Sequence, residues 1–206
     1  RCEKENQDSA EKCASCAHER TMDYIQYRTL SKVSETTSVN WKRTASIPEG
    51  IEKPVLMADE DSTTVFGSKI LRKNIREIEF VKVKKEKVPS GAWDVSEDKK
   101  KTIQAWTEST DKGLILKIGS ENGVYANPNC KSLFSGYSNV KKIEFNHLFD
   151  TSKAICMEYM FYECGELEDI DVSRFNTGNV TDMACMFAFD NKLKKLDMIL
   201  KMQQSN

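Results

Sequence analysis

The residues best suited to metal or redox chemistry lie near the start of the chain, where Cys13 and Cys16 are separated by two positions and followed by His18. With Cys2 they supply thiolate and imidazole groups, the usual protein ligands of Zn²⁺. The same Cys-x-x-Cys spacing is also typical of a redox pair. Neither interpretation has its expected context, because no second Cys-x-x-Cys follows and no strand precedes the motif. A zinc site, a redox pair and plain or disulfide-bonded thiols therefore all stay open, and we expect no bound metal or cofactor.

Carboxylates recur at a nearly fixed interval in the last third of the chain. Glu144, Asp171 and Asp197 are 27 and 26 positions apart (171 − 144 and 197 − 171), and each directly follows an isoleucine or a leucine. If the three segments are parallel strands in register, these carboxylates lie about 4.8 Å from one another. Like charges at that spacing cost free energy, so another group has to offset them.

Four kinds of group could offset this repulsion: a bound cation, a basic partner, the flanking Lys142 and Lys195, or a turn hydroxyl such as that of Ser173. A repeated outward position would also form a multivalent surface. We therefore predict that any binding uses the outward strand face, with these candidates: Glu144, Asp169, Asp171, Lys195 and Asp197.

Catalysis has little support in the sequence. The chain has two histidines, His18 and His147, and neither belongs to a recognisable nucleophile motif. There is no glycine-rich phosphate loop, no His-Glu-x-x-His and no paired-carboxylate signature. A net charge of −1 provides no overall basic field for nucleic acid, and no apolar run approaches the ~18 residues that span a bilayer. We expect a protein that is not an enzyme, binds no nucleic acid and does not insert into a membrane.

One segment occurs twice between positions 149 and 187. Phe149-Asp150-Thr151-Ser152 returns as Phe175-Asn176-Thr177-Gly178, and Met160-Phe161 returns as Met186-Phe187. Each pair is 26 positions apart (175 − 149 and 187 − 161). Such a period is typical of a solenoid, in which each unit buries its apolar face against its neighbours.

Within one unit the sequence predicts a strand, a turn and a short helix. Residues 167–172 end in the alternation typical of a short strand, and residues 173–179 are rich in turn formers. Apolar residues then follow at i, i+3, i+6 and i+7, which favours a short helix or 3₁₀ stretch. We predict an α/β fold, a leucine-rich-repeat-like solenoid of short parallel strands and short helices preceded by a small, mainly β cap.

The same pattern predicts which side chains are inside. Ile143, Ile170 and Leu196 should point into the coils, and the Met-Phe pairs at 160–161 and 186–187 should be buried between them. Residues 75–80 (Ile-Arg-Glu-Ile-Glu-Phe) are nearly identical in pattern to residues 140–145 (Val-Lys-Lys-Ile-Glu-Phe). They predict a further strand that caps or joins the sheet.

The chain divides into three parts. Residues 1–60 predict an N-terminal helix and a linker that could be poorly ordered. For residues 61–130 we predict a β-rich cap with Trp93 and Trp106 in its core. For residues 131–206 we predict about two and a half repeats of 26 residues. After Asp197 the repeat calls for Phe near position 201, but the chain has Lys201. We therefore expect a truncated array, and a fragment without independent function is one alternative.

The repeated segment FDTSKAICMEYMFYECGELEDIDVSRFNTGNVTDMACMF, at positions 149–187, resembles the repeat of BspA-like leucine-rich-repeat surface proteins. Residues 91–96 and 124–128 resemble the segment that precedes such repeats, so the resemblance covers about residues 62–198. It implies a bacterial surface or secreted protein, often lipid-anchored or attached to the wall, without catalytic residues. The implied role is adhesion or binding to a host, matrix or other surface protein.

Overall fold

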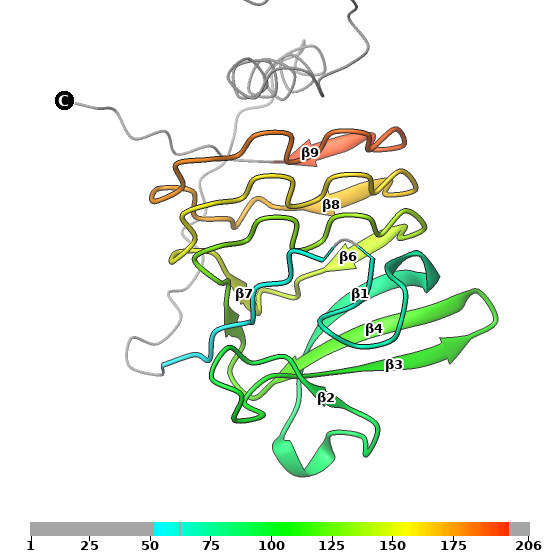
Figure 1. Cartoon of the computed structure of the whole chain (residues 1–206), viewed down its shortest axis with the longest axis vertical. Coiled ribbons are helices and arrows are strands. Elements are labelled where there is room, and N and C mark those ends of the chain that lie inside the picture. Colours follow the sequence, from blue (N-terminus) through cyan, green and yellow to red (C-terminus); the bar gives the residue numbers. More distant parts are fainter. Residues whose placement is uncertain (1–51, 62, 198–206) are drawn as a thin grey trace, which may run out of the picture.

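The computed structural model describes residues 52–61 and 63–197, with the backbone alone for residues 195–197. Figure 1 shows short strands stacked one above another over a cap with longer strands. The described helices and strands are η2 (Arg72–Asn74), β1 (Ile75–Lys82), η3 (Lys85–Lys87), β2 (Trp93–Asp94), β3 (Gln104–Thr110), β4 (Gly113–Ser120), β5 (Val124–Tyr125), β6 (Lys142–Glu144), β7 (Phe149–Asp150), β8 (Asp169–Asp171) and β9 (Lys195–Asp197).

One mixed sheet runs through both parts of the molecule, in the order β2-β3-β4-β1-β6-β8-β9. Strands β2, β3 and β4 pair antiparallel, whereas β4, β1, β6, β8 and β9 are parallel. Strands β5 and β7 form a separate parallel pair, and Figure 1 shows β7 to the left of β1 and β6. The strands of the cap and of the coils therefore belong to one continuous sheet that reaches from the cap to the last described coil.

Strand β1 joins the cap to the coils. It pairs with β4 on one side and with β6 on the other, where Ile78 lies opposite Ile143. The rings of Phe80 and Phe145, two residues further along each strand, have centroids 5.5 Å apart. The prediction that residues 75–80 join the sheet is confirmed.

The prediction of an α/β solenoid with short helices is wrong. In the described part of the chain, helical geometry is confined to the three-residue 3₁₀ helices η2 and η3. Tyr159 and Glu163 have φ values of 55° and 60°, and the equivalent Cys185 and Phe189 have 52° and 64°. Because an L-residue in the left-handed region interrupts a right-handed helix, one such residue every four positions leaves only turns.

Alternate backbone amides of these turns bond to the next coil, while those of Met160 and Tyr162 donate within the turn. The amides of Tyr159 and Phe161 donate to the carbonyls of Ala184 and Met186, each at 2.9 Å. The hydrogen bonds that would close a helix are thereby used between coils. The apolar spacing that suggested a helical face instead places one residue of each turn in the core.

An aromatic column fills the centre of the coils. Phe134, Phe161 and Phe187 stack with centroid separations of 5.6 and 5.1 Å and interplanar angles of 12° and 10°. All three are buried, as are Met160 and Met186. The predicted burial of the Met-Phe pairs is confirmed. In the cap, Trp106 is buried and Trp93 packs against the core, as predicted.

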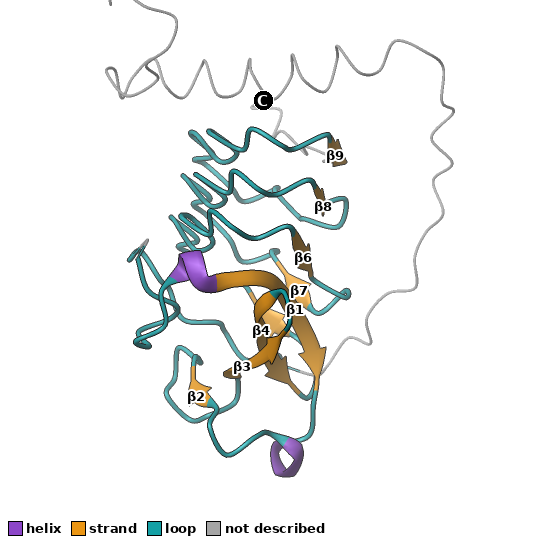
Figure 2. Cartoon of the chain, turned by 90° about the vertical axis from the view of Figure 1, so that its right-hand side faces the viewer, coloured by secondary structure: helices purple, strands orange, loops and turns teal. Residues whose placement is uncertain are grey.

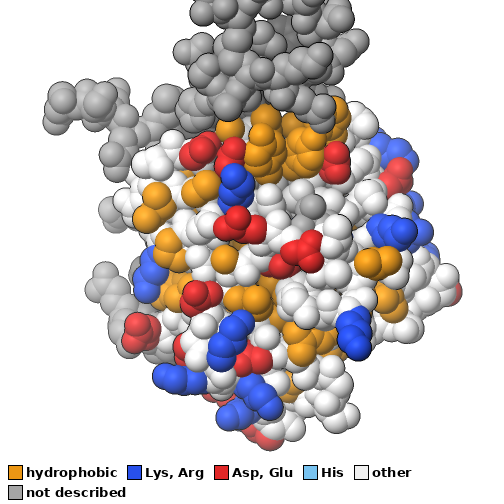
Figure 3. Space-filling model, in the orientation of Figure 1, with side chains coloured by type: hydrophobic (Ala, Val, Ile, Leu, Met, Phe, Trp, Pro, Cys, Tyr) orange, Lys and Arg blue, Asp and Glu red, His pale blue; other side chains and the backbone are white. Residues whose placement is uncertain are grey.

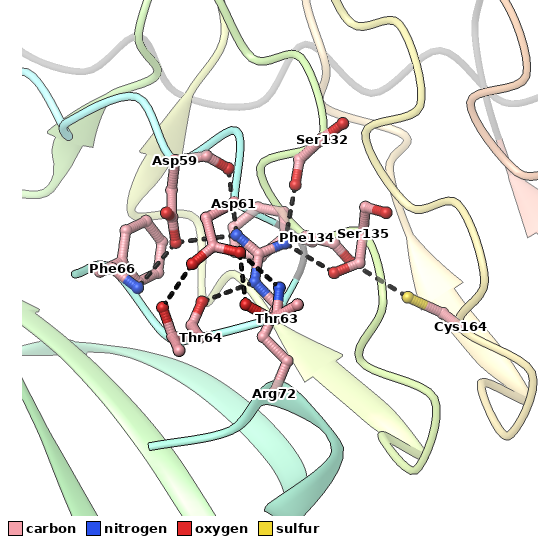
Figure 4. Close-up of polar contacts among 10 residues, drawn as sticks. All are labelled: Asp59, Asp61, Thr63, Thr64, Phe66, Arg72, Ser132, Phe134, Ser135 and Cys164. Atoms are coloured by element: carbon pink, nitrogen blue, oxygen red, sulfur yellow. Dashed lines mark hydrogen bonds and ion pairs between the residues drawn. The ribbon is translucent and has the colours of Figure 1, made fainter. Parts of the chain in front are cut away.

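A fully buried arginine holds the cap against the first coil (Figure 4). Arg72 forms an ion pair with Asp59 at 2.8 Å. Its guanidinium also donates to the carbonyl oxygens of Thr64 at 2.8 Å, Ser132 at 2.8 Å and Ser135 at 2.6 Å. Burial raises the pKa of the Asp59 carboxyl, while the charge of Arg72 opposes that rise. Arg72 therefore links the segment before β1 to the turn that opens the first coil.

Candidate binding site on the strand face

A column of carboxylates crosses the outer face of the parallel strands. Glu79 of β1 pairs in register with Glu144 of β6, and Asp171 of β8 pairs with Asp197 of β9. Glu144 and Asp171 are neighbours because the residues just before them in β6 and β8 are paired. Four successive strands, about 4.8 Å apart, thus carry an acidic residue at the same register position, and for Asp197 only the backbone is described.

A second column, two residues earlier in each strand, alternates in charge. Its members are Glu77, Lys142, Asp169 and Lys195. Opposite charges on neighbouring strands attract one another, so this column is internally balanced. The carboxylate column beside it lacks this balance.

Alternation within each strand fixes which side chains form these columns. Ile78, Ile143 and Ile170 lie between the two outward positions and are buried, so their neighbours have to face outward. The predicted inward positions of Ile143 and Ile170 are confirmed. For Leu196 the backbone register is described but the side chain is not.

Local partners offset the like charges at the cap end of the column. Lys117 of β4 bonds to Glu79, and Lys142 bonds to Glu144. Partial burial alone would lower the pKa of Lys117, but the hydrogen bond and charge of Glu79 raise it above its ordinary value. The hydrogen bond to Glu144 likewise raises the pKa of Lys142.

Asp171 is held by its own turn. Its carboxylate accepts hydrogen bonds from the Ser173 amide at 3.0 Å and from the Ser173 hydroxyl at 2.6 Å. The hydroxyl hydrogen bond holds the pKa of Asp171 below its usual range. Two of the offsets considered from the sequence, Lys142 and Ser173, are therefore present.

A groove with a volume of about 830 Å³ lies over β6, β8 and the loops that follow them. Figure 2 shows these strands in one column on one side of the coils, with the turns on the opposite side. The groove combines carboxylates, cations and phenylalanine side chains. Its charged and aromatic lining is Lys141, Lys142, Glu144, Phe145, His147, Phe149, Asp150, Glu168, Asp169, Asp171, Arg174 and Phe175.

Three of the five residues predicted for binding, Glu144, Asp169 and Asp171, line this groove. Lys195 and Asp197 continue the two columns by backbone register. Sequence reasoning missed that Glu77 and Glu79 begin the columns. The signal for them was available, because residues 75–80 match residues 140–145 and carry acidic residues at both outward positions.

The weak metal candidates Cys2, Cys13, Cys16 and His18 lie outside the described residues. Among the described residues, one group has donor atoms within 4.8 Å of one another: Cys156, Glu158 and Asp182. These donors already have protein partners, since Glu158 pairs with Lys131 at 2.7 Å and Asp182 accepts from the Ala184 amide at 2.9 Å. We therefore assign no metal to this group.

The cysteines of the coils do not align in a ladder from one coil to the next. Cys164 is fully buried, and its thiol donates to the Phe134 carbonyl at 3.1 Å. Cys156 lies in register with Asp182 rather than with Cys185. None of the four described cysteines, Cys130, Cys156, Cys164 and Cys185, forms a disulfide.

Comparison with known proteins finds a family model that is similar to the repeat part. Residues 128–203 match the family model described as "Mycoplasma protein of unknown function, DUF285". No curated protein and no solved structure matches the chain. No helix in the described part of the chain is long and apolar enough to cross a membrane.

Proposed function

We propose that the chain is a non-enzymatic protein-binding or adhesion module of a bacterial surface or secreted protein, and that it binds through the groove on the strand face. The observation that supports this proposal is the pair of in-register charged columns beside an 830 Å³ groove. The BspA-like resemblance of the repeats agrees with it, and the match of residues 128–203 is to a repeat family without assigned function.

The chemistry of the groove favours a polypeptide partner with basic side chains. Glu144 and Asp171 present carboxylates one strand apart, while the exposed edges of Phe149 and Phe175, 6% of each residue, line the same groove. A polypeptide can match both features, placing lysine or arginine over the column and apolar side chains over the rings. A host, matrix or other surface protein is the partner class we propose.

The size of the surface sets the expected affinity. Two to three coils offer an interface at the low end of specific complexes, below ~1,200 Å² in total. We therefore expect weak binding by a single chain, with electrostatic steering of association and a marked dependence on salt.

The test reverses two charges of the carboxylate column. Full-length protein carrying Glu144→Lys and Asp171→Lys is compared with the wild type for binding to purified fibronectin, laminin, collagen and an oligolysine peptide. We expect the affinity for any bound partner to fall by about ten-fold or more, because each reversed pair replaces attraction by repulsion. Salt should then weaken the remaining binding less than it weakens the wild type.

The matched control reverses two exposed acids elsewhere, Glu163→Lys and Asp111→Lys, and changes the net charge equally. It should bind like the wild type. Equal losses in the two double variants would show that only net charge matters and would refute a site on the strand face.

A further inference from the structure

Seven lysines gather at the end of the molecule opposite the last coil. Lys82 ends β1, Lys84 precedes η3, and Lys85 and Lys87 lie within η3. The other three, Lys99, Lys100 and Lys101, are consecutive in the loop before β3. All seven are exposed. Figure 1 places η3 at the tip of the cap, and Figure 3 shows basic side chains interspersed with acidic ones over the lower part of the visible face.

These lysines differ in their partners from three lysines of the coils. Lys131, Lys192 and Lys194 each pair with a glutamate of a neighbouring coil at 2.6–2.7 Å. None of the seven forms an ion pair with another described residue. The ammonium groups at the tip are therefore available to an anion from outside the protein.

The two loops meet at a hollow of about 260 Å³. Lys85, Lys100 and Lys101 line it, and its polar lining otherwise consists of hydroxyl and amide groups together with Glu121. We call this site the lysine hollow. Glu121 already accepts a hydrogen bond from the Lys85 amide at 3.4 Å.

The loop that carries Lys99–Lys101 is held in shape by acids that bond to its backbone. Asp98 accepts from the Lys100 amide at 3.1 Å, and Asp94 accepts from the Lys101 amide at 3.1 Å. Lys99 and Lys101 have φ values of 55° and 58°. The acids nearest to this loop therefore fix its backbone. The Lys99 ammonium contacts the Met57 sulfur at 3.5 Å, whereas Lys100 and Lys101 are exposed without a side-chain partner among the described residues.

We propose that the lysine hollow and the surrounding lysines form a peripheral docking surface for the phosphate headgroups of an anionic lipid membrane. The cations occupy one tip, whereas the carboxylate columns run from β1 towards β9 along the side of the coils. A flat anionic surface touches the tip without meeting these columns. A long nucleic acid that wrapped around the molecule would be repelled by them, so a membrane fits this charge distribution better.

Docking at the tip leaves the strand face open. The surface is independent of the proposed protein-binding groove, because no residue lines both the groove and the lysine hollow. Each lysine close to an anionic membrane increases the membrane–water partition coefficient of the protein about five-fold. Removing three lysines should therefore weaken binding roughly 100-fold.

The experiment measures co-sedimentation of the full chain with vesicles of one part phosphatidylglycerol to two parts phosphatidylcholine. The variant Lys85→Gln/Lys100→Gln/Lys101→Gln is compared with Lys69→Gln/Lys73→Gln/Lys112→Gln, a control that loses the same charge from exposed lysines elsewhere. We expect wild type and control to bind at low salt, and the hollow variant to bind roughly 100-fold more weakly. Pure phosphatidylcholine vesicles should bind none of them.

Two further arms separate other sources of phosphate. Inorganic phosphate should displace the protein from vesicles no better than chloride of equal ionic strength, and a single-stranded oligonucleotide should bind more weakly than the vesicles. The proposal would be overturned if phosphate displaced the protein selectively or if the oligonucleotide bound more tightly than the vesicles. It would also be overturned if the two triple variants lost binding equally, or if the protein did not prefer anionic vesicles. Binding by the strand-face variant Glu144→Lys/Asp171→Lys should persist, which keeps the two surfaces distinguishable.

Discussion

The rings of Phe161 and Phe187 lie 5.1 Å apart between centroids and are within 10° of parallel. The two residues are 26 positions apart and belong to successive coils. Because both are buried and Phe134 extends the stack on the other side, each ring is packed between coils rather than within one.

Replacing Phe187 by alanine should therefore destabilise the protein by ~3–5 kcal/mol, the usual cost of removing a buried phenylalanine. Urea unfolding followed by circular dichroism measures this change. Phe189→Ala is the matched control, because Phe189 is 43% exposed and its loss should cost well under half as much. Similar costs at both positions would contradict the stacked core.

The pair of Arg72 and Asp59 provides a second test. Arg72→Met should cost ~3–5 kcal/mol, because it leaves a buried carboxylate and several buried carbonyls without their donor. Arg72→Lys should restore only part of this loss, since a lysine cannot reproduce the planar fork of the guanidinium. The same urea titrations measure both variants. Wild-type stability in Arg72→Met would mean that the arginine does not join the cap to the first coil.

The free energy of unfolding should fall at acidic pH, because carboxylates that the folded state keeps ionised become protonated there. Hydrogen bonds from the Thr63 and Thr64 hydroxyls lower the pKa of Asp61 to about 2. Burial opposes ionisation of Asp150, but the hydrogen bond from Lys53 brings its pKa below the usual value. A carboxyl with a lowered folded-state pKa stabilises the protein above its ordinary pKa near 4, and that contribution disappears as the pH falls towards the folded value.

The unfolding free energy should accordingly be steady at near-neutral pH and decline between about pH 4 and pH 2. NMR titration of the Asp61 carboxyl gives a direct reading. Thr64→Val removes one donor and should raise the pKa of Asp61, while the decline in stability becomes shallower. An unchanged Asp61 titration in that variant would refute the assigned cause.

Thiol reactivity gives a fourth test. Burial raises the pKa of Cys130 to about 12 and raises that of Cys164 as well. Since the thiolate is the reactive form, iodoacetamide should leave both unmodified in the folded protein at mildly alkaline pH. Peptide mass spectrometry should find them alkylated only after denaturation. Rapid labelling of Cys164 in the native protein would contradict its place in the coil interior.

The repeat made part of the fold predictable from sequence. Its period places Phe161 over Phe187 and Ile143 beside Ile170, because a fixed offset in a stack becomes a spatial neighbour. The strand at 75–80 was predictable for the same reason. The first residue of each column, Glu77 of the alternating column and Glu79 of the carboxylate column, could have been included by extending the comparison to that strand.

The turns and the buried arginine were not predictable in the same way. A spacing of i, i+3 and i+7 does not distinguish a helix from turns that bond between coils, because both put one residue in three or four inside. The left-handed backbone at Tyr159 and Cys185 has no compositional mark such as glycine. Arg72 is followed by lysine and asparagine in an ordinary polar run, and only the tertiary structure brings Asp59 and Ser132 to it.

The sharing of β1 between cap and coils has a mechanical consequence. Each coil rests on the one before it, and the first rests on β1, so the cap acts as a fixed base from which the stack can be peeled. A force applied at the last coil should detach coils in sequence rather than shear the whole sheet at once. Each step would release 26 residues, about 90 Å of extended chain. Single-molecule pulling that recorded one large rupture instead would show that coils and cap yield as a single unit.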